Sequence, residues 1–309
     1  MISRKGIVVG GILLSLLLNA PHGVAAGVSL PAAADSSSSD TTNVHTRTGE
    51  VEYVPEWHSM FTRLPDDWMR FARSTFRLKT IPTMVGMTVL TAVLVATDDE
   101  SWRLSDRLYK SSSLARGASD MLEDIGDGRP QFGLAAGFAV YGLAMGDKRS
   151  LRTGSQLVEC ILACGVVVQV LKHVTGRESP VVSTGPGGKW VILPNQIEYH
   201  KHVPHFDAFP SGHIATSIAT VTVVAENYPE WTWVRPVGYT IVGMIGVAMA
   251  NTGIHWYSDY PLGLALGYSF GMLAAHPDLH DDEANENPAV SVAPALSTQG
   301  TGISLSITF

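Results

Sequence analysis

The sequence is poor in charge and in cysteine for a chain of 309 residues. Charged residues make up 16% of it, against roughly 25% in typical soluble proteins. The formal net charge is −7, with no basic stripe that would neutralise nucleic-acid phosphates, so no nucleic-acid partner is expected. The two cysteines, Cys160 and Cys164, are too few for a disulfide framework. Their spacing puts both on one helix face, as small buried side chains.

Long apolar runs are also scarce. A helix that spans a membrane needs about 20 apolar residues, and the runs here meet that length only marginally, while the mean hydropathy is +0.15. They are long enough for helices rather than strands. We therefore expect an all-α fold, a six-helix bundle whose members are either buried core helices or short spans. The runs lie at 81–97, 131–146, 155–171, 212–225, 236–254 and 261–275.

The N-terminal residues are typical of an export signal. Arg4 and Lys5 precede an apolar run, and small residues at 24–26 offer a cleavage site. We expect a signal peptide over 1–26, with an uncleaved signal anchor as the alternative. Residues 27–60 are expected to be a disordered leader, because 27–50 is rich in Ala, Ser, Thr and Asp. The helical domain is then expected over 61–278.

Three further segments carry weaker signals. Residues 66–79 predict a basic amphipathic helix, either on a membrane surface or packed as an ordinary helix. The charged connection 98–130 predicts one short helix, near 101–110 or near 118–125. The C-terminal part, 279–309, predicts a polar linker and a short β-hairpin tail, because apolar residues alternate at 289–296 and 303–309. One hairpin cannot close a membrane barrel, since its edges would be unsatisfied in lipid.

Polar clusters lie at three predicted helix ends. They are Lys-His-Val-Thr-Gly-Arg-Glu-Ser-Pro at 172–180, Phe-Pro-Ser-Gly-His at 209–213 and His-Trp-Tyr-Ser-Asp at 255–259. In the second cluster Ser211 is a candidate helix cap, and the free N–H groups of a helix N-terminus suit a phosphate. In the third, Asp259 lies four residues after His255, within reach of its ring. A histidine oriented in this way is a candidate base or nucleophile.

Together these clusters resemble the three motifs of the type 2 phosphatidic acid phosphatase and vanadium haloperoxidase superfamily. The family pattern is Lys-x6-Arg-Pro, then Pro-Ser-Gly-His, then Ser-Arg-x5-His-x3-Asp. The middle motif matches in full at 210–213, and the order and spacing fit over roughly residues 150–275. The resemblance implies a helical bundle of the acid phosphatase type.

The resemblance also implies roles for the site residues. His255 would attack phosphorus and form a phosphohistidine, Asp259 would orient and charge-balance it, and His213 would protonate the leaving oxygen. Lys172, the Ser211 hydroxyl and the Gly212 N–H would bind the equatorial phosphate oxygens. Phosphoryl transfer depends mainly on such positioning and charge stabilisation.

Both arginines of the family pattern are missing. Their positions fall on Ser179 in the first motif and on Met249 in the third. Arg177 is the candidate replacement and is expected to bind the substrate phosphate. Further positive charge in the same loop comes from His200, Lys201, His202 and His205. The spacing of these histidines is not that of a metal site, and no metal or cofactor is expected.

The sequence therefore predicts a phosphatase that acts on phosphoric esters or on lipid phosphates and diphosphates. A lipid is favoured because the bundle is apolar and residues 66–79 suggest a membrane surface as partner. The missing arginines leave open a weakened family member that binds or has a structural role. A phosphotransferase to an acceptor other than water is also open, whereas the same losses argue against a vanadate-dependent haloperoxidase.

The expected location is outside the cytoplasm, periplasmic or membrane-associated. If the signal were cleaved and all six runs crossed a membrane, Lys172 would lie in the cytoplasm, opposite to the family's usual arrangement. Two interpretations avoid this conflict: an odd change in the number of spans, or an exported domain with buried rather than spanning helices, which we favour.

Overall fold

The computed structural model describes residues 58–277, 289–297 and 300–308. The expected signal peptide and most of the expected leader lie outside these residues. The first described helix, α2 (Ser59–Thr62), begins two residues before the expected start of the helical domain at 61.

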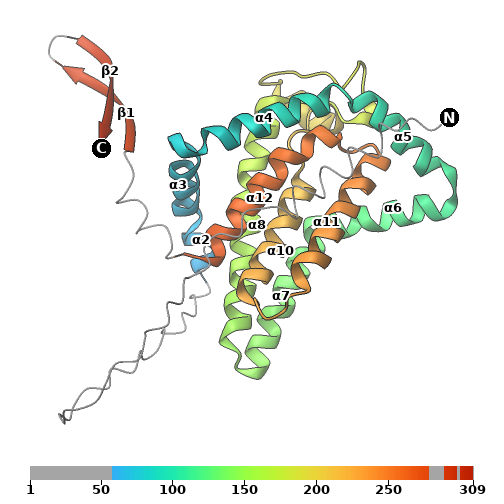
Figure 1. Ribbon diagram of the computed structural model, residues 1–309, viewed down its shortest axis with the longest axis horizontal. Coiled ribbons are helices and arrows are strands. Elements are labelled where there is room, and N and C mark those ends of the chain that lie inside the picture. The colour runs from blue at the N-terminus through green and yellow to red at the C-terminus, as the bar shows by residue number, and fades with distance from the viewer. Residues whose placement is uncertain (1–57, 278–288, 298–299, 309) are drawn as a thin grey trace, which may run out of the picture. The chain divides into compact units, whose positions relative to one another are not determined.

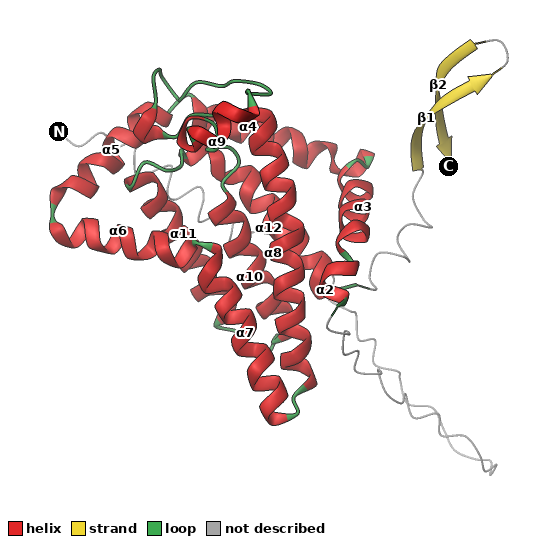
Figure 2. Cartoon of the chain, turned by 180° about the vertical axis from the view of Figure 1, so that it is seen from behind, coloured by secondary structure: helices red, strands yellow, loops and turns green. Residues whose placement is uncertain are grey.

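The described chain before residue 278 is mostly helical, and the all-α prediction is confirmed (Figure 2). All six apolar runs form helices: α4 (Ile81–Val95), α7 (Gly128–Met145), α8 (Lys148–Thr175), α10 (Gly212–Asn227), α11 (Val234–Asn251) and α12 (Tyr260–Ala275). The other helices are α3 (Leu64–Thr75), α5 (Asp98–Ser111), α6 (Ser113–Gly126) and α9 (Gln196–Lys201). Short 3₁₀ turns are η1 (Leu78–Thr80), η2 (Pro180–Val182), η3 (Val203–His205) and η4 (Tyr257–Asp259).

The centre of the bundle is formed by α8, α10 and α12, which pack on one another (Figure 1). The helix α7 covers α8, and α11 covers α10. The closest approach joins α12 to α10, where a Cβ on Gly267 would lie 2.0 Å from the carbonyl oxygen of Ala215. Only glycine fits there without moving a helix. Cys160 and Cys164 are buried and unpaired in this core, as predicted.

The predicted basic helix at 66–79 is shorter than expected. Helix α3 ends at Thr75, and the chain turns at Phe76 before η1. The apolar side of α3 faces the protein: Nε1 of Trp68 donates to the carbonyl oxygen of Ala163 at 3.0 Å, and the rings of Phe71 and Phe270 stack at 4.8 Å. For α3 these contacts favour the packing-helix alternative over a free membrane-surface helix.

The connection 98–130 holds two helices, α5 and α6, where one short helix was expected. They are separated at Ser112, whose backbone is extended and whose side chain accepts a hydrogen bond from the backbone N–H of Ala115 at 3.1 Å. This is an ordinary N-cap. The two positions given as alternatives, 101–110 and 118–125, are both helical, and α5 packs against α11 and η4.

Helix α4 exposes most of its apolar surface. Val85, Val89 and Val93 are each more than half exposed, and Leu94 is the residue of α4 that is buried. Within the described part of the chain, two helical segments, Leu78–Val95 and Lys148–Thr175, are long and apolar enough to cross a membrane, but the second is the central core helix α8. Apolar surface of this kind is consistent with membrane association.

The predicted hairpin is present as a two-stranded antiparallel sheet. It pairs β1 (Ala289–Ser297) with β2 (Gly300–Thr308), in a register that places Ala289 opposite Thr308. The second strand begins at Gly300 rather than at 303, because the glycines expected in the turn pair within the ladder.

Candidate active site

The three sequence clusters meet at one end of the bundle. Lys172 lies in the last turn of α8, His213 in the first turn of α10, and His255 with Asp259 in the connection that leads through η4 into α12. Ser211 caps α10, as predicted, and accepts a hydrogen bond from the backbone N–H of Ile214. The long connection between α8 and α10, with α9, lies at this same end together with α4 (Figure 2).

The two motif histidines face each other. Nδ1 of His213 lies 3.4 Å from Nε2 of His255. Nδ1 of His255 lies 2.7 Å from the carbonyl oxygen of Ala208, which can only accept, so Nδ1 carries the proton. In the neutral ring Nε2 is then unprotonated and directs its lone pair towards His213. His255 is 1% exposed, whereas His213 is half-buried.

Burial keeps both imidazoles uncharged. Desolvation, then the neighbouring His255 and Lys172, lower the pKa of His213 to about 3. Desolvation and Lys172 also lower the pKa of His255 to about 3, although Asp207 and the Ala208 carbonyl act in the opposite direction. Both rings are therefore neutral near pH 7 when no anion is bound.

Asp259 is fully buried and is held mainly by groups other than His255. One carboxylate oxygen accepts from the backbone N–H of Trp256 at 2.7 Å and lies 3.5 Å from Nδ1 of His255. The other forms an ion pair with Arg177. Burial raises the pKa of Asp259 to about 6 despite the opposing effect of Arg177.

Arg177 does not occupy the phosphate-binding position expected for it. Its side chain is fully buried, and each of its five N–H groups has an acceptor within the described residues. The acceptors are the Gly187 carbonyl oxygen at 3.2 and 2.6 Å, the Ser258 hydroxyl at 2.6 Å, the Asp98 carboxylate at 2.7 Å and the Asp259 carboxylate. The guanidinium orients the third motif and has no donor left for a phosphate.

Lys172 is the remaining cation of the motifs beside the histidines. It is 6% exposed, and its Nζ lies 3.5 Å from a carboxylate oxygen of Asp207. Asp207, which precedes Ala208, is partly exposed and offsets the charge of Lys172. Of the groups expected to bind a phosphate, Lys172 and the capped N-terminus of α10 at Ser211 and Gly212 therefore remain as candidates.

The positions of the two missing arginines are packed. Ser179 is 2% exposed, and its backbone N–H donates to the carbonyl oxygen of Pro204 at 2.8 Å. Met249 is fully buried in an apolar cluster with Ile214 and Tyr260. Neither position has space to spare for a guanidinium.

Three of the four basic loop residues lie beside acidic side chains, whereas His200 contacts the rings of His173 and Tyr199. Lys201 and His202 contact Glu198 at 3.2 and 3.8 Å, and His205 lies 3.6 Å from Glu178. Glu178 in turn accepts from the backbone N–H groups of Thr184 and Lys189, which organises the loop. Over residues 58–277, 289–297 and 300–308, no group of three or more His, Cys, Asp or Glu side chains is placed to hold a metal ion.

The sequence reasoning missed three groups that act on the site, namely the carbonyl oxygen of Ala208 and the carboxylates of Asp98 and Asp207. A backbone carbonyl leaves no signal in the sequence. Asp98 is the first of several acidic residues at the start of α5. Acidic side chains are common at this position in helices because they interact favourably with the positive end of the helix dipole. Only its complete burial distinguishes Asp98.

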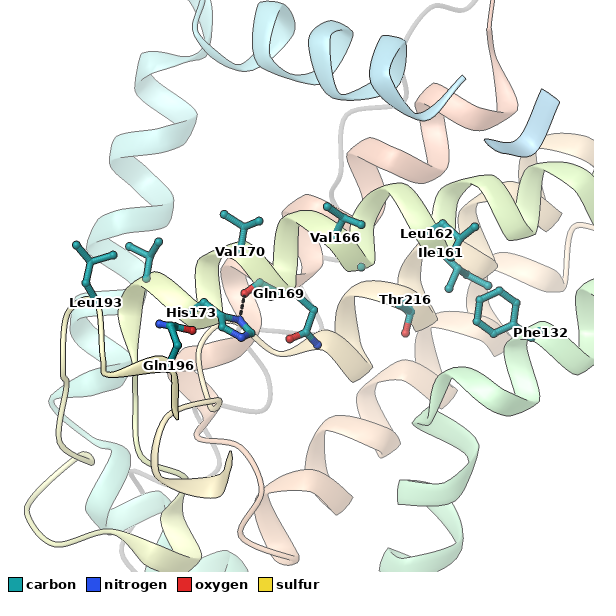
Figure 3. A pocket seen from close by; sticks show the side chains of 12 residues that line it. Phe132, Ile161, Leu162, Val166, Gln169, Val170, His173, Leu193, Gln196 and Thr216 are labelled. Atoms are coloured by element: carbon teal, nitrogen blue, oxygen red, sulfur yellow. Dashed lines mark hydrogen bonds between the residues drawn. The ribbon is translucent and has the colours of Figure 1, made fainter. Parts of the chain in front are cut away.

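An apolar groove of about 720 Å³ runs along α8 beside the site (Figure 3). Thr216, one turn after Gly212 on α10, lies at its edge, and His173, which follows Lys172, lines it with Nδ1 bonded to the carbonyl oxygen of Gln169 at 2.8 Å. Most of the remaining lining is apolar, including Phe132, Ile161, Leu162, Val166 and Val170.

This part of the chain is similar to known proteins. No curated protein matches the sequence. The crystal structure of LpxE from Aquifex aeolicus is 19% identical, with a TM-score of 0.43 over 57% of this chain and 93% of that one. A PAP2-type phosphatidylglycerolphosphate phosphatase from Bacillus subtilis is 14% identical, with a TM-score of 0.41 over 63% and 94%. Residues 153–277 match the model of the PAP2 superfamily, and this range contains all three sequence clusters, so the predicted resemblance is confirmed over these residues.

Proposed function

We propose that the chain is a phosphatase that works through a phosphohistidine on His255. Nε2 of His255 attacks phosphorus, a P–N bond forms, and the P–O bond to the leaving alcohol breaks. His213 gives a proton to that alcohol and then takes one from the water that hydrolyses the P–N bond. The observation that supports this most strongly is the Nδ1–H bond of His255 to Ala208, because it leaves the lone pair on Nε2.

The proton that His213 donates must arrive with the substrate. When no anion is bound His213 is neutral, since its pKa is lowered to about 3. A phosphate group next to the ring favours the charged imidazolium and raises that pKa. A phosphate monoanion can therefore transfer its own proton to His213 on binding. Because His255 is only 1% exposed, the phosphate reaches Nε2 after His213 or the loop before α10 moves.

The clamp that holds the phosphate is weaker than the family pattern. It would consist of Lys172, the Ser211 hydroxyl and the Gly212 N–H. A lost donor to the transition state costs on the order of 10²–10³ in rate. We therefore expect a slow enzyme rather than an inactive one.

We propose a lipid phosphate or diphosphate as the substrate. The groove along α8 includes Thr216, one turn from Gly212, and offers apolar side chains to an acyl chain. Helix α4 presents exposed valines that would rest against a bilayer.

The test is phosphate release by the purified full-length protein. Phosphatidic acid in mixed micelles and p-nitrophenyl phosphate in solution serve as the lipid and soluble substrates. His255→Ala is expected to abolish release from both, and the lipid is expected to give the higher kcat/KM. Release that persists in His255→Ala would refute the mechanism, and preference for the soluble ester would refute the lipid assignment.

A second candidate function is binding or structural, favoured by the full engagement of Arg177 with protein acceptors. A family member of this kind would bind phosphate or vanadate without turnover. Vanadate that binds the wild type with no measurable phosphate release from any substrate would favour this alternative.

We also propose that the site faces the outside of the cytoplasm. Lys189 is exposed in the loop between α8 and α10, while both native cysteines are buried. A Lys189→Cys variant in intact cells is expected to react with a membrane-impermeant maleimide only if that loop is exported. Labelling that requires cell lysis would place the loop in the cytoplasm.

A further inference from the structure

A buried carboxylate outside the PAP2 match is tied directly to the third motif. Asp98 begins α5 and is fully buried. One of its oxygens accepts from Nη2 of Arg177 at 2.7 Å and from the Ser258 hydroxyl. The other lies 3.4 Å from the backbone N–H of Ser258. Ser258 immediately precedes Asp259, so Asp98 holds both the cation and the chain that position that residue.

These contacts close a ring of hydrogen bonds. Arg177 donates to the Ser258 hydroxyl at 2.6 Å, and this hydroxyl donates to Asp98, which accepts from Arg177. Arg177 is thereby fixed at two edges, between the Asp98 and Asp259 carboxylates. A guanidinium held by Asp259 alone would be free to turn about that pair, whereas the second carboxylate sets its plane.

The backbone of Arg177 is also linked to His255, the proposed nucleophile, through Ala208. Its carbonyl oxygen accepts from the backbone N–H of Ala208 at 3.0 Å, and the carbonyl oxygen of Ala208 accepts from Nδ1 of His255. The position of Arg177 therefore sets two neighbours of His255, one through its side chain and one through its backbone. Asp98 anchors Arg177 for both contacts, together with the Gly187 carbonyl oxygen that accepts from Nε and Nη2 of Arg177.

Helix α5 also packs against the same motif through side chains that do not touch Arg177. Trp102 meets Trp256 edge to face, with ring centroids 6.1 Å apart. The hydroxyl of Ser105 lies 3.2 Å from that of Tyr257. A variant that removes one of these contacts therefore measures what the packing of α5 contributes, without changing the groups that hold Asp259.

We propose that Asp98 is a positioning residue of the His255 site, which acts through Arg177 and Ser258 to fix the Asp259 carboxylate and the Ala208 carbonyl around the imidazole. The kinetic part of this proposal rests on the proposed phosphatase function; the structural part does not.

The first test compares Asp98→Asn with Ser105→Ala. The asparagine keeps the size of Asp98 but removes its charge, and we expect kcat to fall about 10- to 100-fold, as for the loss of groups that orient a functional histidine. KM is expected to stay within about twofold, because Asp98 does not reach the phosphate clamp of Lys172 and α10. Ser105→Ala removes a buried hydrogen bond between the same helix and η4, and its kcat is expected to stay within about threefold.

Equal losses of kcat in the two variants would reduce Asp98 to a packing role and overturn the proposal. Should Asp98→Asn fail to fold, Ser258→Ala removes one link of the ring with a smaller change, and an intermediate fall in kcat is expected. An unchanged kcat in Ser258→Ala would then overturn the proposal.

The second test does not depend on turnover. The Nδ1–H of His255 is observed by NMR in protein labelled with ¹⁵N-histidine, and His255→Gln assigns the signal. Asp98→Asn is expected to shift this signal and speed its exchange with water, whereas Ser105→Ala leaves it in place. A wild type without phosphatase activity would refute the proposed function alone; an unmoved signal in Asp98→Asn would refute the positioning role alone.

Discussion

The carbonyl oxygen of Ala208 lies nearer to Nδ1 of His255, at 2.7 Å, than does the carboxylate of Asp259, at 3.5 Å. The backbone, rather than the acid of the His-x3-Asp motif, thus fixes the tautomer of the proposed nucleophile. The carboxylate contributes charge and holds the surrounding chain through Trp256 and Arg177. This division of roles makes a definite prediction for variants of Asp259.

Asp259→Asn is expected to reduce kcat by about 10- to 100-fold without changing the tautomer of His255. The amide keeps the size of the carboxylate but removes the negative charge that would stabilise a charged intermediate. Steady-state phosphate release gives kcat, and ¹⁵N chemical shifts of the ring give the tautomer. If the proton moves to Nε2 in the variant, Asp259 and not Ala208 sets the tautomer.

Lys172 and Asp207 are expected to shift the acid limb of the pH–rate profile in opposite directions. The limb reports protonation of His255, whose pKa is lowered by Lys172 and raised by Asp207. Lys172→Gln removes a positive charge, so the pKa of His255 rises and the limb moves to higher pH. Asp207→Asn removes a negative charge, so the limb moves to lower pH. Shifts of the same sign would contradict this electrostatic picture.

The same pair is expected to differ in substrate binding. Asp207 offsets the charge of Lys172 across 3.5 Å, so Asp207→Asn leaves a stronger cation for the phosphate and should lower KM. Lys172→Gln should raise KM and also lower kcat, by roughly 10²–10³ for the loss of one donor to the transition state. Both constants come from the same initial-rate measurements.

Protein stability is expected to fall at acid pH in a way that depends on His213. Its folded-state pKa is lowered to about 3, against about 6.5 in an unfolded chain. Between these values the unfolded state binds the extra proton, so this residue makes stability rise with pH and be lost as pH falls below about 6.5.

The measurement compares urea unfolding of the wild type and His213→Gln from pH 4.5 to pH 8. The variant lacks this proton uptake, so its free energy of unfolding should depend less steeply on pH below 6.5, by up to about 1.4 kcal/mol per pH unit. Above pH 7.5 the two curves should run parallel, because the imidazole is then neutral in both states. Parallel curves over the whole range would mean that the ring is not desolvated.

The sequence predicted the bundle well because periodic apolar runs over 10 residues favour helices whatever their partners are. It also brought together Lys172, His213 and His255, since each motif lies at a helix end. The sequence did not predict the roles of residues whose partners are set by tertiary contacts. Nothing local distinguishes the buried Asp98 from a helix-starting acid at the surface, and nothing local showed that the donors of Arg177 are taken by protein groups rather than left for a phosphate.

The crossing of α10 and α12 is expected to tolerate no side chain at Gly267. A Cβ there would lie 2.0 Å from the carbonyl oxygen of Ala215 and 2.4 Å from Cγ2 of Ile218. Gly267→Ala must therefore push the two helices apart, at a cost of roughly 1–3 kcal/mol in the free energy of unfolding. Because α10 carries His213 and α12 follows Asp259 directly, the shift should also lower kcat.

Gly243→Ala is the matched control for that crossing. Gly243 lies inside α11, and a Cβ on it would meet nothing within 4 Å. Alanine is the better helix former, so this variant should gain about 0.5–1 kcal/mol of stability with kcat unchanged. Urea unfolding and initial rates of both variants test the pair. A stable and fully active Gly267→Ala would show that the helices can separate without disturbing the histidines, and that close packing of α10 on α12 does not set the geometry of the site.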